Sequence, residues 1–324
     1  MKKNIAIVMG GYSSEVNISH ASGKVVYRQL DKGKYLPFRV HILKEKWVAL
    51  DEFDKEYAID KNDFSFVLEG EKITFDCVFN AIHGAPGENG ILLAYFDLIN
   101  LKHTSAPFYQ MALTFNKRDT LSVVKEYGVK TAVSVYLNKG NIVDLDTIIE
   151  KVGLPCFVKP NNAGSSYGIS KVHTKAAMLP ALEKAYKEDA AILIESFLDG
   201  TEVSVGVIQY KGETKVLPIT EIVTENDFFD YEAKYEGKSE EITPARITAK
   251  EKKKVEEIAK KVYAILNMSG FSRSEYILVK GEPYFLEMNT VPGLTEKSIL
   301  PEQAQKAGIS LTELFDNAIE SAFL

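Results

Sequence analysis

Cysteine is scarce in this chain of 324 residues, which contains two. Cys77 and Cys156 each lie inside a short apolar run, a setting typical of buried thiols, so the sequence predicts neither a disulfide framework nor a cysteine metal site. Long apolar runs are also lacking, since no stretch approaches the ~20 residues that a membrane-spanning helix needs. The apolar run between Lys3 and Gly10 is too short for a signal peptide, so we expect a cytoplasmic protein without a membrane segment.

No basic block stands out either. The chain carries 39 lysines and arginines against 45 aspartates and glutamates, a net charge of −6, so nucleic acid is not an expected partner. Any phosphate ligand must then be held by individual lysines and backbone N–H groups. With 45% hydrophobic and 26% charged residues, the composition is that of a soluble globular protein, and the length predicts two or three domains.

The segment from Phe271 to Ser298 carries the strongest local signal. Two apolar runs flank the turn 280–282, a pattern that predicts a β-hairpin. Glu287 and Asn289 are two residues apart and face the same way, and pairing about the turn brings Glu275 close to Glu287. Such an all-oxygen set suits Mg²⁺ or Mn²⁺ better than zinc. Ordinary solvated acids explain the hairpin equally well, but the loop 289–295 adds free backbone N–H groups and favours a metal site.

The N-terminal part predicts a parallel sheet with ligand-binding turns. Apolar strands are expected at 4–9, 35–43 and 76–82, and glycine-rich turns follow the first and third of them. Ligands gather at the carboxyl ends of such strands, so we expect the two turns to face one crevice. Glu15 begins a helix expected over 15–30, where an acid is also favoured by the helix dipole alone. His83 begins the second turn, and a lone histidine is more often a structural hydrogen-bonding group than a catalyst.

The middle of the chain contains a loop of small residues, 161–168, between a strand ending at Lys159 and strand sequence that resumes at Ile169. It lacks the GxxxxGK[ST] pattern of a P-loop. Its backbone N–H groups and hydroxyls can approach phosphate oxygens closely, so we interpret it as a flap between two antiparallel strands. Lys159 and Lys117, the latter in a helix expected over 108–127, supply positive charge, although single lysines are usually solvated surface groups.

The last part of the chain predicts further strands at 191–195, 201–209 and 215–222, and helices at 251–266 and 311–323. A long polar loop, 224–245, interrupts them, and its aromatic residues favour a folded lid over disorder. The predicted units are residues 1–106, 107–190 and 191–324.

Six segments, taken together and in order, resemble one family. They are GGYSSE, HGAPGENG, FVKPNNAGSSYGISKV, IESFLDGTEVSV, YEAKY and FLEMNTVPGLTEKS. The chain from Gly10 to Ser298 is similar to D-alanine–D-alanine ligases of the ATP-grasp superfamily. The resemblance implies an α/β, three-domain ATP-grasp fold with an N-terminal open parallel α/β domain, and ATP held between the second and third domains.

The resemblance also implies a reaction. ATP phosphorylates the carboxylate of one D-alanine, and the amine of a second D-alanine attacks the acyl phosphate to give D-alanyl-D-alanine for peptidoglycan precursor synthesis. Two Mg²⁺ (or Mn²⁺) ions and a homodimer belong to the same expectation. The developing negative charge requires preorganised cations and N–H donors.

Matching positions imply the roles of individual residues. The expected metal ligands are Glu275, Glu287 and Asn289. The residues expected to bind ATP are Lys117, Lys159, Ser165, Ser166 and Lys234 at the phosphates, and Glu195, Phe197, Leu198 and Glu202 at the nucleoside.

The substrate residues follow in the same way. Glu15 is expected to hold the ammonium group of the first D-alanine, and His83 is a further substrate-binding candidate. Arg273 and the N–H of Gly293 are expected to form the oxyanion site. Ser298 is expected to bind the carboxylate of the acceptor.

The lid completes the expected catalytic set. Ser165 and Tyr235, with Glu15, are expected to form a hydrogen-bonded triad that locks the lid over the intermediate and excludes water. The sequence departs from the family pattern at three positions: Glu275 and Asn89 each stand where aspartate is usual, and Tyr167 stands where a small aliphatic residue is commoner.

Three alternatives remain at this stage. A D-alanine–D-lactate ligase is disfavoured by Tyr235, since a phenylalanine at that position is associated with the depsipeptide product. Another ATP-grasp carboxylate–amine ligase would share the ATP half, and only Glu15, Tyr235 and Ser298 argue against it. A regulatory ATP-binding module without catalysis would not need an oxyanion residue such as Arg273.

Overall fold

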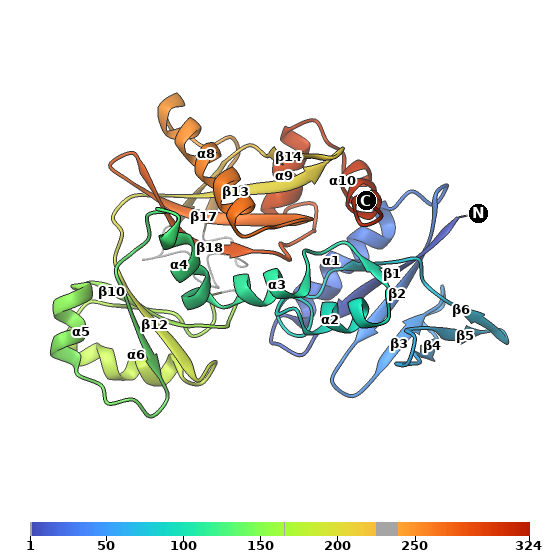
Figure 1. Ribbon diagram of the computed structural model, residues 1–324, viewed down its shortest axis with the longest axis horizontal. Coiled ribbons are helices and arrows are strands. Elements are labelled where there is room, and N and C mark those ends of the chain that lie inside the picture. Colours follow the sequence, from blue (N-terminus) through green and yellow to red (C-terminus); the bar gives the residue numbers. More distant parts are fainter. Residues whose placement is uncertain (1, 165, 225–238) are drawn as a thin grey trace.

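The structure is a computed structural model that describes residues 2–164, 166–224 and 239–324 (Figure 1). Its N-terminal unit is built on a sheet with strand order β4-β3-β2-β1-β7-β8. These strands are β1 (Lys3–Gly10), β2 (Tyr35–Ile42), β3 (Trp47–Leu50), β4 (Glu56–Ala58), β7 (Cys77–Asn80) and β8 (Lys102–His103). The helices of the unit are α1 (Val16–Gln29) and α2 (Ile91–Leu98), and β5 (Phe66–Leu68) pairs with β6 (Glu71–Ile73).

Strand β1 lies at the centre of this sheet. Ile5, Ile7 and Met9 face one hydrophobic cluster while Ala6 and Val8 face another, so the strand is buried on both sides. This explains its unbroken apolar sequence. β1 pairs in parallel with β2 and β7, as predicted, but β3 and β4 add an antiparallel edge, so the sheet is mixed.

The central unit has a four-stranded antiparallel sheet in the order β11-β10-β12-β9. Its strands are β9 (Ser134–Asn138), β10 (Cys156–Pro160), β11 (Ser170–Val172) and β12 (Ala191–Ser196). The helices α5 (Leu145–Val152) and α6 (Met178–Ala185), with the short 3-10 helix η1 (Lys175–Ala177), lie beside it (Figure 1). Because β12 pairs with both β9 and β10, the predicted boundary after residue 190 cuts this sheet, and the third unit begins after Ser196.

A second difference concerns the helix expected over 108–127. It is two helices, α3 (Phe108–Phe115) and α4 (Lys117–Glu126), separated by Asn116 in an extended conformation (φ −89°, ψ 100°). The Asn116 side chain accepts a hydrogen bond from the N–H of Asp119 and so caps α4. Asparagine is a preferred N-cap residue, which explains the break at this position.

The C-terminal unit has a sheet in the order β16-β15-β13-β17-β18, with β14 also paired to β13. The strands are β13 (Thr201–Tyr210), β14 (Glu213–Val216), β15 (Thr220–Thr224), β16 (Ser239–Ile242), β17 (Phe271–Val279) and β18 (Glu282–Asn289). The helices are α8 (Ala249–Ile265), α9 (Ile299–Lys306) and α10 (Leu311–Ser321). Most of the predicted lid, residues 225–238, lies outside the described residues.

The predicted hairpin is β17–β18. Its turn consists of Lys280 and Gly281, both with positive φ (51° and 75°), the backbone that a two-residue hairpin loop requires. A β-bulge next to Tyr276 shifts the register by one residue. Counting straight back from the turn would place Leu286 opposite Glu275, whereas the bulge brings Glu287 opposite Glu275.

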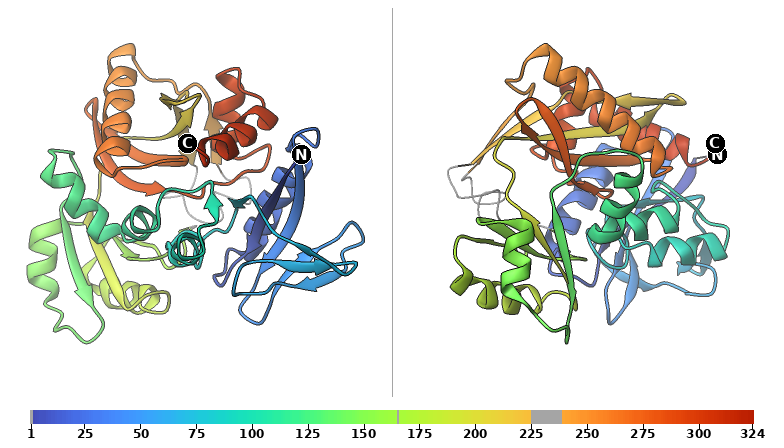
Figure 2. Two further views of the ribbon diagram at one scale, coloured as in Figure 1. Left: turned by 45° about the vertical axis from the view of Figure 1, so that its right-hand side comes forward. Right: turned by 60° about the vertical axis from the view of Figure 1, so that its left-hand side comes forward.

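The hydrophobic core is shared unequally among the units. One cluster lies within the central unit, between residues 137 and 194. Two other clusters each combine N-terminal and C-terminal residues, as where Ile7 of β1 and Phe315 of α10 belong to the same cluster. Figure 2 shows the N-terminal unit (blue) beside the C-terminal helices (red).

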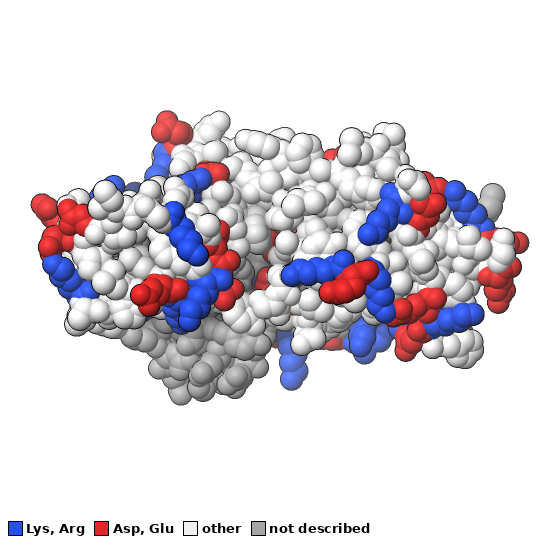
Figure 3. Space-filling view, turned by 90° about the horizontal axis from the view of Figure 1, so that it is seen from below, with Lys and Arg blue, Asp and Glu red and all other residues white. Residues whose placement is uncertain are grey.

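The surface shows no concentration of one charge on the face that Figure 3 presents, where lysine and arginine alternate with aspartate and glutamate. Among the described residues, no helix is both long and apolar enough to cross a membrane.

Candidate active site

The two glycine-rich turns meet at one edge of the N-terminal sheet, as predicted. The hydroxyl of Ser13 donates to the carbonyl of His83 at 3.2 Å. Gly84 (φ +69°) lies against this contact, and a Cβ there would be 2.7 Å from Ser13 Oγ and 3.0 Å from Glu15 Oε2. Only a glycine leaves room for both side chains.

The carboxylate of Glu15 is buried where the N-terminal unit meets the flap of the central unit. A Cβ on Gly164 would lie 2.8 Å from Glu15 Oε1, so the flap backbone passes directly over this carboxylate. The next flap residue, Ser165, lies outside the described residues, as do Lys234 and Tyr235. The expected triad of Ser165, Tyr235 and Glu15 therefore stays a prediction.

A cavity of about 410 Å³ lies between the central sheet and the C-terminal sheet, and we call it the interdomain cavity. Eight of the predicted residues line it: Lys159, Ser166, Glu195, Phe197, Leu198, Glu202, Glu275 and Glu287. Its apolar walls include Phe157, Ile169, Ile277 and Leu286, none of which we predicted. An apolar slot with a few convergent polar groups is the usual form of a small-molecule site.

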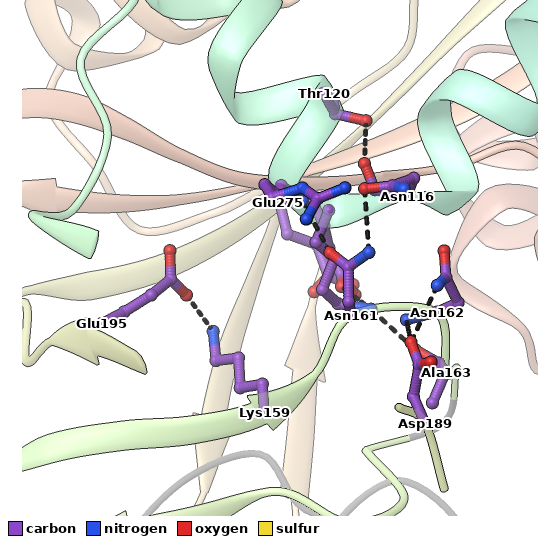
Figure 4. A network of polar contacts seen from close by, with 12 residues as sticks. Asn116, Thr120, Lys159, Asn161, Asn162, Ala163, Asp189, Glu195 and Glu275 are labelled. Carbon is purple, nitrogen blue, oxygen red and sulfur yellow. Dashed lines mark hydrogen bonds and ion pairs between the residues drawn. The ribbon is translucent and has the colours of Figure 1, made fainter. Parts of the chain in front are cut away.

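Lys159 and Glu195 form an ion pair inside this cavity, with Nζ 2.8 Å from Oε2 (Figure 4). Burial opposes the charge of Lys159, but the carboxylates of Glu195, Glu287 and Glu202 together outweigh it, so the pKa of Lys159 lies above its ordinary value. The other carboxylate oxygen, Oε1 of Glu195, is buried and has no hydrogen-bond partner among the described residues. It can accept a hydrogen bond from a ligand, such as the amino group of a purine.

Lys117 connects the flap to the hairpin. As the first residue of α4 it points away from the helix, and its Nζ donates to the carbonyl of Ala163 at 2.6 Å and lies 3.3 Å from Glu287. The helix break at Asn116 is what gives Lys117 this position. A lysine between a flap and a carboxylate at a cavity edge is well placed for a phosphate.

Asn161 is a buried residue that we did not predict, and it fixes the base of the flap (Figure 4). Its Nδ2 donates to Asn116 Oδ1 at 2.9 Å, and its Oδ1 accepts from the N–H of Arg118 at 2.8 Å. Asn162 follows with two hydrogen bonds to Asp189. The signal in the sequence was the Asn161–Asn162 pair, which we treated only as small flap residues.

The predicted metal ligands lie at the open end of the hairpin. Glu275 faces Glu287 across the two strands and accepts from Arg273 Nη2 at 2.9 Å. Asn289, opposite Arg273, has a buried Oδ1 without a hydrogen-bond partner among the described residues. In the described part of the chain no three His, Cys, Asp or Glu side chains form a metal cluster, and this set has two carboxylates and an amide. An orphaned amide oxygen beside two carboxylates fits a hard cation such as Mg²⁺.

The predicted oxyanion donor and the predicted acceptor site are adjacent. A Cβ on Gly293 would lie 2.7 Å from Ser298 Oγ. Ser298 is the N-cap of α9, and its Oγ is 2.8 Å from Thr295 Oγ1. A helix N-terminus favours a carboxylate, so this corner suits the acid group of an amino-acid substrate.

Comparison with known proteins identifies the family to which the chain belongs. A family model described as D-ala D-ala ligase N-terminus matches residues 4–106, and one described as D-ala D-ala ligase C-terminus matches residues 123–320. The chain belongs to the D-alanine–D-alanine ligase family. The resemblance drawn from the six sequence segments is thus confirmed.

Curated relatives of this ligase family match along the whole chain. The D-alanine–D-alanine ligase of Flavobacterium johnsoniae is 68% identical over 98% of both chains. That of Christiangramia forsetii is 56% identical over 99% of both, and that of Phocaeicola vulgatus is 42% identical over 100% of both.

Solved structures of the ligase family confirm the three-domain ATP-grasp fold. The D-alanyl-alanine synthetase A of Vibrio cholerae has a TM-score of 0.88 and 26% identity, covering 99% of this chain and 98% of that one. The VanG D-Ala:D-Ser ligase of Enterococcus faecalis has a TM-score of 0.86 and 28% identity, covering 99% and 100%. The Bacillus anthracis D-alanine–D-alanine ligase complexed with ATP has a TM-score of 0.80 and 25% identity, covering 99% and 97%.

In this ligase-family chain His83 is a buried, neutral imidazole. Burial and the nearby positive charge of Arg273 lower the pKa of His83 to about 4. Its Nε2 lies 3.1 Å from the hydroxyl of Ser22. At neutral pH His83 is therefore a hydrogen-bonding group, and its place as a substrate-binding residue stays a prediction.

Glu88, in the second glycine-rich turn, is a residue of the ligase site that we did not predict. Its buried carboxylate accepts from the N–H of Gly84 at 3.0 Å, and the N–H groups of Thr290 and Val291 also favour its charged form. Burial and repulsion from Glu15 raise the pKa of Glu88 to about 7 despite these hydrogen bonds. The sequence places Glu88 in the glycine-rich turn, two residues before Gly90. No local pattern indicates that it contacts the distant loop after β18.

This shift predicts a pH dependence of stability. Because the folded chain holds the Glu88 proton more tightly than the unfolded chain, the stability that Glu88 contributes is present below its ordinary pKa and is lost as pH rises through about 7. Glu88→Gln should remove this loss. The free energy of unfolding of the variant should therefore rise relative to that of the wild type as the pH increases from about 4.5 to 7. Urea unfolding at several pH values measures the free energy of unfolding of both proteins. If the two free energies change with pH in the same way, the assignment is contradicted.

Proposed function

We propose that the protein is a ligase that joins two D-alanine molecules at the expense of ATP. The observation that carries this proposal is the approach of the flap to Glu15, because it sets a carboxylate that can hold an ammonium group beside a flap that can hold phosphates. The family relationship along the whole chain supports it.

ATP would bind in the interdomain cavity. Glu195 Oε1 would accept from the adenine amino group, the backbone of Phe197 and Leu198 would contact the ring edge, and Glu202 would contact the ribose. Lys159 and Lys117 would hold the phosphates. The ion pairs that these lysines make with Glu195 and Glu287 orient them before the nucleotide arrives.

In the first step an oxygen of the D-alanine carboxylate attacks the γ-phosphorus, and the bond to the ADP oxygen breaks. Glu15 would hold the ammonium group of this D-alanine. The product is an acyl phosphate, which gives the carboxyl carbon a leaving group. Glu275, Glu287 and Asn289 would hold Mg²⁺ or Mn²⁺, which neutralises phosphate charge when bound.

In the second step the free amine of another D-alanine attacks the acyl carbon. Arg273 and the N–H of Gly293 would stabilise the oxyanion of the tetrahedral intermediate. The C–O bond to phosphate then breaks, phosphate leaves with its electron pair, and the nitrogen loses a proton. Ser298 and the N-terminus of α9 would orient the acceptor through its carboxylate.

A homodimer in the cytoplasm completes the proposal. Ile91 and Leu98, seven residues apart on one face of α2, are exposed, and so are Phe108 and Tyr109 at the start of α3. Apolar side chains gathered on two adjacent helices suit a contact with a second copy of the chain. Light scattering of the purified protein measures its mass in solution.

Phosphate release from ATP and Mg²⁺ tests the function, with D-alanine, L-alanine, D-alanine plus D-lactate, and D-alanine plus D-serine. Release that requires D-alanine, with D-alanyl-D-alanine identified by mass, is the expected result. A mixed product with D-serine or D-lactate as the main species would assign a different acceptor. Release that is indifferent to D-alanine would overturn the proposal.

A further inference from the structure

The loop after β18, which carries Gly293, is tied to the N-terminal unit by a buried serine. Ser22 lies on α1 and is fully buried. Its Oγ accepts a hydrogen bond from the N–H of Leu294 at 3.2 Å and lies 3.1 Å from Nε2 of His83. One hydroxyl thus contacts both the residue next to Gly293 and the imidazole beside Arg273.

The direction of these hydrogen bonds follows from the donors available. The N–H of Leu294 can only donate, so the Ser22 oxygen is its acceptor. Among the described residues Ser22 Oγ has no other acceptor within reach, so its single hydroxyl proton is used only if it points at His83 Nε2, which must be unprotonated to accept it. A neutral imidazole with an unprotonated Nε2 carries its proton on Nδ1.

We propose that Ser22 is a positioning residue of the ligase: it holds the Gly293–Leu294 backbone in place and fixes His83 as the Nδ1–H tautomer. This inference rests on the proposed function, since the purpose of the arrangement is to aim the Gly293 N–H and the His83 ring at the reacting carboxyl group. The N-terminal unit then contributes to catalysis beyond its own substrate contacts.

A second contact supports the same geometry. The carboxylate of Glu88 interacts favourably with the N–H groups of Thr290 and Val291, so two side chains of the N-terminal unit act on the loop 290–294, one at each end. Glu88 acts on the backbone alone, whereas Ser22 connects the backbone to an imidazole. Removal of the Ser22 hydroxyl is therefore expected to change which nitrogen of His83 carries the proton, whereas removal of Glu88 is not.

Ser19 provides a matched control on the same helix. It is also fully buried, accepts from the N–H of Gly10 at 2.8 Å and donates to the carbonyl of Ala81 at 2.7 Å. Both partners belong to the N-terminal unit and lie outside the proposed reaction path. Ser19→Ala removes the same hydroxyl and two comparable hydrogen bonds without reaching the loop 290–294.

The first test compares Ser22→Ala with Ser19→Ala in steady-state kinetics. Ser22→Ala should lower kcat by about 10- to 10²-fold, the size expected when catalytic groups are slightly misplaced, and leave the KM for ATP unchanged. Ser19→Ala should keep the kcat of the wild type. Equal kcat values for the two variants would overturn the proposal.

The second test uses the imidazole nitrogen-15 signals of His83, assigned by their loss in His83→Gln. The wild-type protein should show a protonated Nδ1 and an unprotonated Nε2, and Ser19→Ala should show the same pattern. In Ser22→Ala the Nε2 signal should move towards that of a protonated nitrogen. A protonated Nε2 in the wild type would overturn the proposal without any variant.

The two tests separate this inference from the proposed function. If the wild-type protein makes no dipeptide, the ligase proposal fails, whereas the tautomer of His83 is still measured directly. If dipeptide forms normally and Ser22→Ala changes neither kcat nor the nitrogen-15 signals, Ser22 is not a positioning residue.

Discussion

Replacing Arg273 by alanine is expected to lower kcat by about 10²- to 10³-fold, the cost of losing one preorganised oxyanion donor. Its guanidinium is held by Glu275 at 2.9 Å, and its Nε is buried without a partner among the described residues. A fixed positive charge in a site shielded from water stabilises a nearby oxyanion strongly. Because the oxyanion forms only on the way through the transition state, this stabilisation lowers the barrier and not the energy of the bound substrate. The effect should therefore appear in kcat, with little change in the KM for ATP.

Arg39 is the appropriate control for this experiment. Its side chain is 16% exposed against 13% for Arg273, and it too pairs with a carboxylate, that of Asp54 at 2.6 Å. Arg39 lies on β2, outside the residues that line the interdomain cavity. Arg39→Ala should lose comparable packing and retain wild-type turnover. A near-wild-type kcat for Arg273→Ala would remove Arg273 from the oxyanion site.

Glu287→Gln is expected to raise the Mg²⁺ concentration for half-maximal activity by about 10²-fold or more, because loss of even an outer partner of a metal ligand costs about 10- to 100-fold. The amide keeps the size of the side chain but loses the charge that faces Glu275 and Lys117. Binding of Mn²⁺ in the presence of ADP, measured by electron paramagnetic resonance, should weaken in parallel.

The control is Glu282→Gln on the same strand. Glu282 is paired with Lys130 and Lys254 on the surface and does not line the cavity. This variant should show the Mg²⁺ titration of the wild type. An unchanged titration for Glu287→Gln as well would mean that the metal site lies elsewhere.

The hairpin shows what local sequence can predict. The Lys280–Gly281 turn was evident from the glycine, and it fixes the pairing of β17 with β18. The pairing of Glu275 with Glu287 also depends on the bulge beside Tyr276, which no glycine or proline marks. The predicted proximity was correct, but the sequence did not contain the register shift that places the two carboxylates directly opposite each other.

Errors arose where distant residues decide the structure. The end of the central unit was misplaced because Ala191–Ser196 is followed by a strand of the next unit, and only pairing with β9 and β10 shows where it belongs. The break at Asn116 required weighing a capping side chain against an otherwise helical sequence. Ser22 and Glu88 act on a loop that lies 272 residues beyond Ser22 and about 200 beyond Glu88, and periodicity carries no information at that range.

The unequal division of the core has a mechanical consequence. The central sheet, with α5 and α6, keeps a hydrophobic cluster of its own, whereas the first and last units share theirs across a common boundary. Separating the N-terminal unit from the C-terminal unit would therefore expose many apolar side chains to water, whereas α5 and α6 pack against the central sheet. The interdomain cavity thus lies at the boundary between a sheet with a core of its own and two units that share theirs.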